Sequence, residues 1–266
     1  MTAGPGVDYA FFPHPGTTAL KDAGARFAGR YISAETANDA NGKNLLPAEC
    51  KALLGAGVQI IVIVEEGASY MLGGHAAGAA AAAHADAVVK ALGMPGIPVY
   101  IAADFDATPA QQAPINDCLD GMASVIGRSR TGLYGGYWPV SRALDAGKCH
   151  YAWQTVAWSG GQWDHRAHIR QGLSFTLDGA SVDHDQAIFT DFGQWPRPAA
   201  PPPPAPGPGP YKHATKAGDT VTRLAASRGY TDPAEWLALQ ARLGADTRKL
   251  GSGPLPAGIE WRSVNP

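Results

Sequence analysis

Two carboxylates at the end of an apolar run are the clearest candidates for chemistry in this sequence. Residues 99–108, VYIAADFDAT, pass from apolar side chains to Asp104 and Asp106, which are spaced i and i+2. In a strand this spacing puts both side chains on one face. Because apolar residues precede the pair and Pro109 follows it, we expect both acids at the C-terminal end of a buried strand, where α/β folds hold their active sites.

Other acidic residues fall at the ends of further predicted strands. They are Asp8, Glu65 with Glu66, and Asp183 with Asp185. In a parallel barrel the strand ends converge on one rim, so these side chains would share a pocket although they lie far apart in the sequence. Glycoside hydrolysis needs such a set, because one carboxyl group donates a proton to the leaving oxygen while another stays ionised.

Two other interpretations of these acids stay open. Most Asp and Glu side chains lie at protein surfaces, so each acid alone could be a loop cap or an ion-pair partner. Clustered Asp side chains also bind Mg²⁺ or Ca²⁺, but no supporting His or phosphate-binding loop accompanies them here. The sequence has no G-x-S-x-G motif, and its three Cys lack C-x-x-C spacing. We therefore expect neither a metal nor a cofactor.

Aromatic and amide side chains are concentrated in the same part of the chain. Five of them are candidates for substrate contacts: Tyr134, Trp138, Gln154, Trp158 and Gln171. Flat rings with polar edges suit the faces of sugar rings, and glutamines next to strand ends can hydrogen-bond to hydroxyl or acetamido groups. Packing in the core is the competing interpretation for Tyr134 and for Trp153.

The apolar runs and turn residues predict an α/β fold. Strands are expected at residues 6–12, 26–32, 58–64, 99–106, 131–134, 151–155, 168–171 and 181–187, and helices at 47–54, 73–92, 114–127 and 140–146. Runs that are apolar throughout are typical of a parallel sheet covered on both faces. About eight strands, most followed by a helix, indicate an irregular (β/α)8 TIM-like barrel in residues 1–196, with a degraded final third. A doubly wound open sheet is the alternative, although no Gly-rich phosphate loop supports it.

The end of the chain has a different composition. Residues 197–210, RPAAPPPPAPGPGP, cannot join a packed core and predict an extended linker. Residues 211–266 predict a small α+β domain with helices at 221–227 and 233–242, the first capped by Asp219 and Thr220.

The charge and hydropathy patterns argue against two classes of partner. The net charge is −2 and the 21 Lys and Arg residues are scattered, so we expect no nucleic-acid surface. The alanine-rich residues 73–92 contain two His, an Asp and a Lys, so they predict a buried amphipathic helix and no membrane span. The N-terminal residues lack a basic segment followed by an apolar one, so we expect no signal peptide.

The segments GVDYA, FAGRYI, LLPAECKALLGAGVQIIVI, VYIAADFD, GLYGGYWPV, YAWQTVAWSGG, SVDHDQA and FGQW, spread over residues 6–195, carry a family resemblance. They resemble the glycoside-hydrolase-like domain of actinobacterial cell-wall proteins and phage lysins. That domain is similar to the family 25 glycoside hydrolases, muramidases with an irregular (β/α) barrel. Their pattern has an N-terminal Asp, a D-x-E on the fourth strand and a late Asp.

Carried over by position, that pattern implies Asp8, the pair Asp104 and Asp106, and Asp183 as site residues. The resemblance implies that Asp106 is the proton donor, with Glu65 as its rival, and that Asp104 orients the substrate or stabilises the oxocarbenium-like state. Asp106 stands where the muramidases have Glu. The shorter side chain moves the donor by roughly 1.5 Å, which threatens catalysis.

Residues 213–229, HATKAGDTVTRLAASRG, resemble the start of a LysM module, which binds the N-acetylglucosamine chains of peptidoglycan or chitin. The two resemblances imply an enzyme that cuts peptidoglycan glycan strands and is held on the cell wall by its tail, delivered as a phage lysin or with a virion. The alternative is an inactive wall-binding or structural component that assembles with phage tail or virion proteins.

Overall fold

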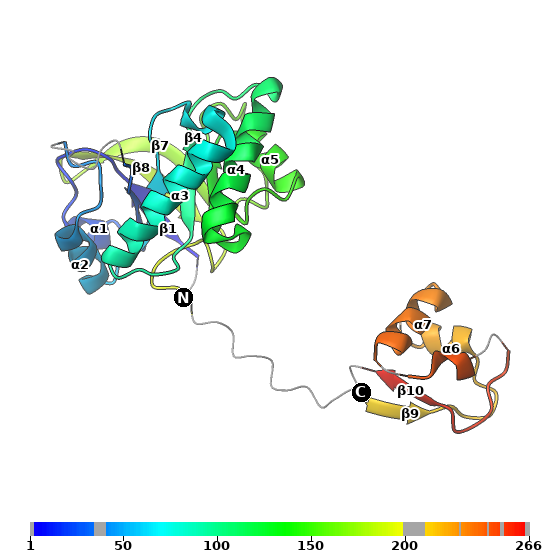
Figure 1. Cartoon of the computed structure of the whole chain (residues 1–266). Helices are drawn as coiled ribbons and strands as arrows, with labels where there is room; N and C mark the ends of the chain where they lie inside the picture. The colour runs from blue at the N-terminus through cyan, green and yellow to red at the C-terminus, as the bar shows by residue number, and fades with distance from the viewer. Residues whose placement is uncertain are drawn as a thin grey trace. The chain divides into compact units, whose positions relative to one another are not determined.

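The computed structural model describes residues 3–34, 41–198, 211–228, 230–243, 245–250 and 253–263 (Figure 1). The chain divides into two compact units, Met1–Pro198 and Ala199–Pro266. The predicted linker 197–210 lies largely outside the described residues. Arg197 itself belongs to the first unit, because its guanidinium hydrogen-bonds to Asp191 and to the hydroxyl of Tyr151.

Eight strands of the first unit form a closed barrel in chain order. They are β1 (Pro5–Asp8), β2 (Phe27–Tyr31), β3 (Gln59–Val64), β4 (Val99–Ala103), β5 (Thr131–Gly135), β6 (Tyr151–Thr155), β7 (Ile169–Leu177) and β8 (Ala180–Ala187). Neighbours from β1 to β7 are parallel, whereas β8 is antiparallel to both β7 and β1. The expected eight-stranded α/β barrel is confirmed, but its sheet is mixed.

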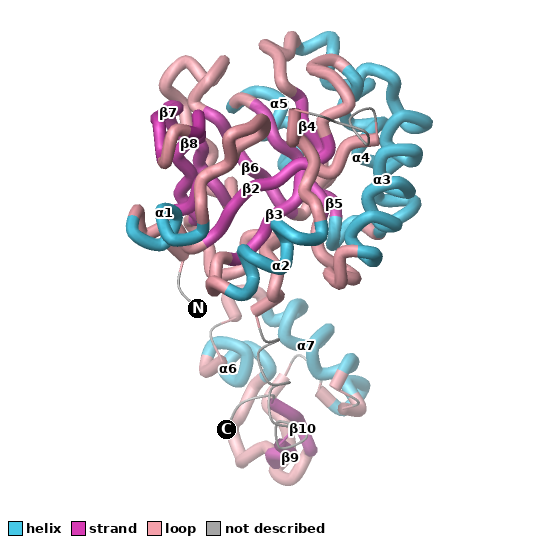
Figure 2. Tube along the Cα trace, turned by 90° about the vertical axis from the view of Figure 1, so that its left-hand side faces the viewer, coloured by secondary structure: helices cyan, strands magenta, loops and turns pink. Residues whose placement is uncertain are grey.

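Helices follow the first five strands and cover the outside of the barrel (Figure 2). They are α1 (Thr17–Asp22), α2 (Pro47–Gly55), α3 (Gly74–Ala91), α4 (Gln112–Ile126) and α5 (Tyr137–Asp145). Short 3-10 turns occupy Tyr70–Gly73, Pro109–Gln111 and Arg128–Arg130.

The last strands depart from the predicted pattern. The sequence pattern predicts short strands at 168–171 and 181–187, whereas β7 and β8 form one long hairpin. Its turn, Asp178–Gly179, has positive φ at both residues, as a two-residue hairpin turn requires. Because a two-residue turn leaves no room for a crossover, β8 must run antiparallel.

Apolar side chains fill both faces of the sheet. Every residue of β3 and of β4 is buried, as expected for parallel strands covered on both sides. Large rings fill the barrel interior, among them Phe27, Tyr100, Tyr151 and Trp153. A second cluster lies between the strands and the helices. This packing makes the interior a solid support for the side chains at the rim.

The alanine-rich helix α3 packs closely against α4. A Cβ atom on Gly78 would lie 1.8 Å from the carbonyl oxygen of Cys118, and one on Gly121 would lie 2.0 Å from that of His75. Small side chains therefore allow a close helix–helix contact, in addition to the buried face that the sequence predicted. No described helix is both long and apolar enough to cross a membrane.

The second unit has its own small core. Strands β9 (Tyr211–Ala214) and β10 (Glu260–Ser263) pair antiparallel, and between them lie α6 (Val221–Ala226), α7 (Pro233–Arg242) and a 3-10 turn at Thr247–Lys249. The two predicted helices are confirmed. The Thr220 hydroxyl accepts a hydrogen bond from the Arg223 backbone amide and caps α6. Trp236 and Trp261 are buried at the centre of this unit.

Candidate active site

Two acids meet where β1 ends and β8 begins. Asp8 is the last residue of β1, and the antiparallel register places Asp183 directly opposite it. Because β8 runs the other way, its first half lies at the rim where the parallel strands end. Asp185 is two residues further along β8 and so shares a face with Asp183, but it lies deeper and is fully buried.

Amide and hydroxyl groups hold these carboxylates in place. The Nε2 atom of Gln171 on β7 donates to Oδ2 of Asp8 at 2.7 Å and to Oδ2 of Asp183 at 3.4 Å. Its Oε1 atom accepts from the Tyr134 hydroxyl at 2.7 Å. The Ser174 hydroxyl donates to the other oxygen of Asp183. Both Gln171 and Tyr134, which the sequence analysis assigned to substrate contacts, thus lie among the acids.

Asp8 and Asp185 form a buried pair. Burial and the charge of Asp183 raise the pKa of Asp8, and burial and the charge of Asp8 raise the pKa of Asp185 well above its usual range. The indole Nε1 of Trp153 donates to Oδ1 of Asp185 at 2.9 Å. Gly29 makes room for them, since a Cβ there would lie 2.7 Å from both the Asp8 Cβ and the Trp153 ring.

Another pair of acids follows β3 and β4. Lys43 forms an ion pair with Glu65, with 2.9 Å between Nζ and Oε2. Asp104 is half-buried, and its pKa is raised by burial and then by the negative charges of Glu65 and Asp183. The same acids act on the Tyr31 phenol, whose pKa is raised by burial and by the charges of Asp8, Glu65 and Asp104. These electrostatic influences link Glu65 and Asp104 to Asp8 and Asp183.

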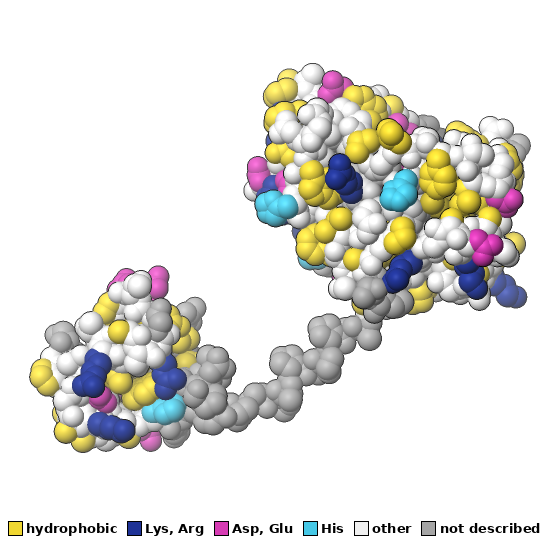
Figure 3. Space-filling model, turned by 180° about the vertical axis from the view of Figure 1, so that it is seen from behind, with side chains coloured by type: hydrophobic (Ala, Val, Ile, Leu, Met, Phe, Trp, Pro, Cys, Tyr) yellow, Lys and Arg dark blue, Asp and Glu magenta, His cyan; other side chains and the backbone are white. Residues whose placement is uncertain are grey.

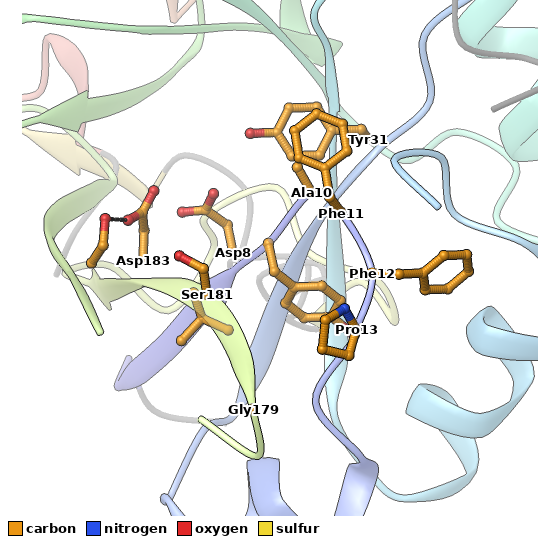
Figure 4. A pocket seen from close by; sticks show the side chains of 12 residues that line it. Asp8, Ala10, Phe11, Phe12, Pro13, Tyr31, Gly179, Ser181 and Asp183 are labelled. Atoms are coloured by element: carbon orange, nitrogen blue, oxygen red, sulfur yellow. Dashed lines mark hydrogen bonds between the residues drawn. The ribbon is translucent and has the colours of Figure 1, made fainter. Parts of the chain in front are cut away.

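A pocket of about 370 Å³ opens beside Asp8 and Asp183. Figure 4 shows their carboxyl groups next to each other on one side, with Phe11, Phe12 and Pro13 on the other. Both phenylalanines are exposed although they are large and apolar. The pocket therefore combines an acidic wall with an apolar one, which suits a sugar ring with polar edges and an apolar face.

The loop that carries Phe11 and Phe12 is tied to the outside of the barrel. The buried Arg30 donates to Oε1 of Glu49 at 2.8 Å and to the Tyr9 carbonyl oxygen, and Nδ1 of His14 lies 3.2 Å from Oε1 of Glu49. Burial alone would raise the pKa of Glu49, but hydrogen bonds from His14 and Arg30 lower it to about 2. The resulting network of hydrogen bonds and ion pairs holds the beginning of the loop that forms the apolar wall of the pocket.

The other predicted site residues are not among those that line this pocket. Asp106 is exposed, and its carboxylate has no hydrogen bond or ion pair within the described parts of the chain. Gln154 is buried and faces away from the pocket, because it hydrogen-bonds to the Gln162 carbonyl oxygen and the Asp164 backbone amide. Trp138 and Trp158 are exposed in the segments after β5 and β6, at the same end of the barrel as the acids.

Several contributors to the site were not singled out from the sequence. Asp185 was noted only as a neighbour of Asp183, and Trp153 only as core. No sequence pattern points to Lys43 or Tyr31 as site residues, because their roles depend on interactions with acids that are distant in the sequence. The i and i+2 spacing of Asp183 and Asp185 was the available sign for Asp185.

On the face shown in Figure 3, charged side chains are scattered among neutral ones.

Comparisons with known proteins agree on the first unit. The Rv2525c-like, glycoside hydrolase-like domain family matches residues 18–187. A protein of Mycobacterium tuberculosis named "Putative peptidoglycan hydrolase Rv2525c" is 31% identical over 201 residues, which cover 71% of this chain and 82% of that protein. A crystal structure of the M. tuberculosis Tat-secreted protein Rv2525c in complex with HEPES matches with a TM-score of 0.66 at 30% identity, covering 72% of this chain and 98% of that one.

A more distant structure shows how widely the fold occurs. GHIP, described as a glycosyl hydrolase 25 of Streptococcus pneumoniae, matches with a TM-score of 0.51 at 17% identity, covering 69% of this chain and 86% of that one. At this identity the likeness concerns the fold alone. The family model ends at residue 187 and so does not extend to the second unit.

Proposed function

Because the chain belongs to the Rv2525c-like, glycoside hydrolase-like domain family, we propose that its barrel hydrolyses the glycan strands of bacterial peptidoglycan. The name of the M. tuberculosis relative supports this substrate. The observation that carries the proposal is the pocket lined by Asp8 and Asp183, together with the nearby Asp104, whose pKa is raised by burial and by the charges of Glu65 and Asp183. Such a carboxyl group can donate a proton to the leaving oxygen of a glycosidic bond.

We assign the proton donor to Asp104 in place of Asp106. Asp104 is half-buried and is acted on by the charges of Glu65 and Asp183, whereas Asp106 is exposed and has no partner within the described residues. A general acid works best when its pKa lies near the working pH, and the raised pKa of Asp104 moves it in that direction. Asp8 and Asp183 then face the sugar as the charged wall, while Glu65 remains beside Asp104 as its electrostatic partner.

The aromatic side chains extend the substrate path. Tyr134 and Gln171 contact a sugar at the centre of the site. Trp138 and Trp158 stack on sugar rings further along the glycan strand. Trp158 adopts a φ of 53°, which is strained for a residue with a large side chain. Strain of this kind at an exposed aromatic residue supports a role in binding. Gln154 has no substrate role in this proposal, because its amide is used within the loop.

We extend the proposal to the second unit, which we take to be a LysM-like wall-binding module. Its strand, helix, helix, strand order and its paired β9 and β10 support the resemblance seen in residues 213–229. Gln240 joins α7 to β10, because its amide bonds to the backbone of Arg262 in both directions. Secretion, as in the Tat-secreted relative, is one route to the wall, and release with a phage is the alternative.

The test is the release of soluble fragments and new reducing ends from purified actinobacterial peptidoglycan. Replacing a general acid typically costs about 100-fold or more. We therefore expect Asp104→Asn to lose cleavage by about that factor, and Asp106→Asn to stay within about threefold of the wild type. If Asp106→Asn loses as much as Asp104→Asn, the assignment of the donor is wrong. If the wild type releases nothing across a wide pH range, the hydrolase proposal fails.

A second candidate is a protein that binds cell-wall glycan without cutting it, for instance within a phage tail. The exposed position of Asp106 favours it, because the resemblance puts the proton donor at that residue. In that case wild type and Asp104→Asn would co-sediment equally with peptidoglycan, and neither would release fragments.

A further inference from the structure

We propose that Asp185 is a positioning residue that keeps its proton at neutral pH and donates it to Asp8, so that the two carboxyl groups carry one negative charge between them. The shared proton follows from the contacts of the described residues alone. Its use in positioning Asp8 rests on the proposed glycosidase function.

One carboxyl oxygen of Asp185 accepts no hydrogen bond from the described groups. Oδ1 of Asp185 accepts from the indole of Trp153 at 2.9 Å. Oδ2 is buried and has no hydrogen-bond donor among the described groups. The carboxyl group of Asp8, itself 2% exposed, lies opposite Asp183 on the strand face that Asp185 shares, so the two buried carboxyl groups are neighbours. Two such buried neighbours require a proton between them, since neither ionised group can donate.

The Asp8 side of the pair is already organised as an acceptor. Oδ2 of Asp8 receives the Gln171 amide at 2.7 Å, and that amide is oriented by the Tyr134 hydroxyl. Asp8 therefore holds the charge, and Asp185 holds the proton. Removing water from a charged carboxylate is costly, so one charge on the pair is favoured over two.

The surrounding groups do not supply a compensating cation. The titratable groups that act on the pair are Asp183 on β8, Tyr31 and Arg30 on β2, and Tyr134 on β5. Arg30 is the one cation among them, and Glu49 already neutralises it on the outer side of the sheet. Consistent with this, burial and the charge of Asp8 raise the pKa of Asp185.

The direct test is the infrared absorption of a protonated carboxylic acid at about pH 7, where an ordinary Asp is ionised. The wild type should show this band, and its intensity should fall in Asp185→Asn by the contribution of one carboxyl group. The matched control is Asp164→Asn, because Asp164 is also buried but is paired with Arg166, which lowers its pKa to about 2. The control should leave the band unchanged.

Stability against pH gives a second readout. A carboxyl group with a raised pKa in the folded state stabilises the fold at low pH and loses that contribution as the pH rises. The amide introduced by Asp185→Asn imitates the protonated acid at every pH. The unfolding midpoint of this variant should therefore rise relative to that of the wild type as the pH increases from about 5 to about 8. Asp164→Asn should show the opposite trend, with its loss of stability disappearing as the solution becomes strongly acidic.

The outcomes separate this inference from the proposed function. A wild type without the band, or a band of undiminished intensity in Asp185→Asn, overturns it. If Asp185→Asn does not fold, carboxyl carbon chemical shifts of labelled aspartate in the wild type decide the same point. If the wild type cleaves peptidoglycan, Asp185→Asn should retain cleavage, and its rate should decrease less at alkaline pH than that of the wild type. Asp185→Ala should lose cleavage. An inactive wild type would leave the infrared result unaffected.

Discussion

Gln171 is the residue that joins the two acids at the rim, and its amide offers a test of how Asp8 is held. In Gln171→Met the side chain keeps its length but loses the donor at 2.7 Å from Asp8. That hydrogen bond lowers the pKa of Asp8, so its loss should raise this pKa further. We expect the acid limb of the pH profile of glycan release to move to higher pH, with a loss of about 1–3 kcal/mol in the free energy of unfolding.

The matched control is Gln154→Met on the neighbouring strand. Gln154 is also a buried strand glutamine, but its amide bonds only within the loop after β6. It should lose a similar amount of stability and leave the pH profile unchanged. Equal shifts in both variants, or none in Gln171→Met, would contradict the role of Gln171.

At this scale, the sequence locates those residues whose position depends on their place along a strand. Asp8 and Asp104 could be found because strand ends are visible as the end of an apolar run. The proton shared by Asp8 and Asp185 could not, because it depends on which strands are neighbours and in what register. Asp106 illustrates the same limit: the i and i+2 rule applies within a strand, but β4 ends at Ala103, before both acids.

The contact between α3 and α4 is the clearest test at the scale of elements. Because a Cβ on Gly78 would lie 1.8 Å from the carbonyl oxygen of Cys118, Gly78→Ala should force the helices apart. We expect it to lower the free energy of unfolding by about 1–3 kcal/mol, measured by chemical denaturation. Gly55→Ala, at the end of α2 where nothing lies within 4 Å of the added atom, should raise it by about 0.5–1 kcal/mol. A neutral Gly78→Ala would show that α3 and α4 pack less closely.

The elements themselves were largely predictable, and the exceptions have a physical reason. Strands such as β3 and β6 are buried on both faces, so their apolar runs mark them directly. The β7–β8 hairpin was missed because its strands carry polar side chains over much of their length. The Asp178–Gly179 pair was the local signal for a hairpin turn. Without it, the antiparallel direction of β8, which brings Asp183 to Asp8, could not be foreseen.

For the whole molecule, the composition of the chain predicted two units, and the structure assigns them separate cores. The boundary lies after Pro198, one residue beyond Arg197, since Arg197 is held by Asp191 and Tyr151. A charged side chain at the start of a Pro-rich segment gives no sign of such contacts. What the second unit binds is not determined by its fold, so its role is best tested by removing it.

We expect a chain of residues 1–198 to fold alone and to unfold within about 2 °C of the barrel transition in the full chain, because its core and its Arg197 contacts are complete. If the second unit tethers the barrel to the wall, removal should weaken co-sedimentation with insoluble peptidoglycan by about 10- to 100-fold. Cleavage of short soluble glycan fragments should stay unchanged, since a tether raises the local concentration of the polymer alone. Unchanged co-sedimentation would contradict wall binding by the second unit, and a barrel midpoint lower by several degrees would contradict the independence of the two units.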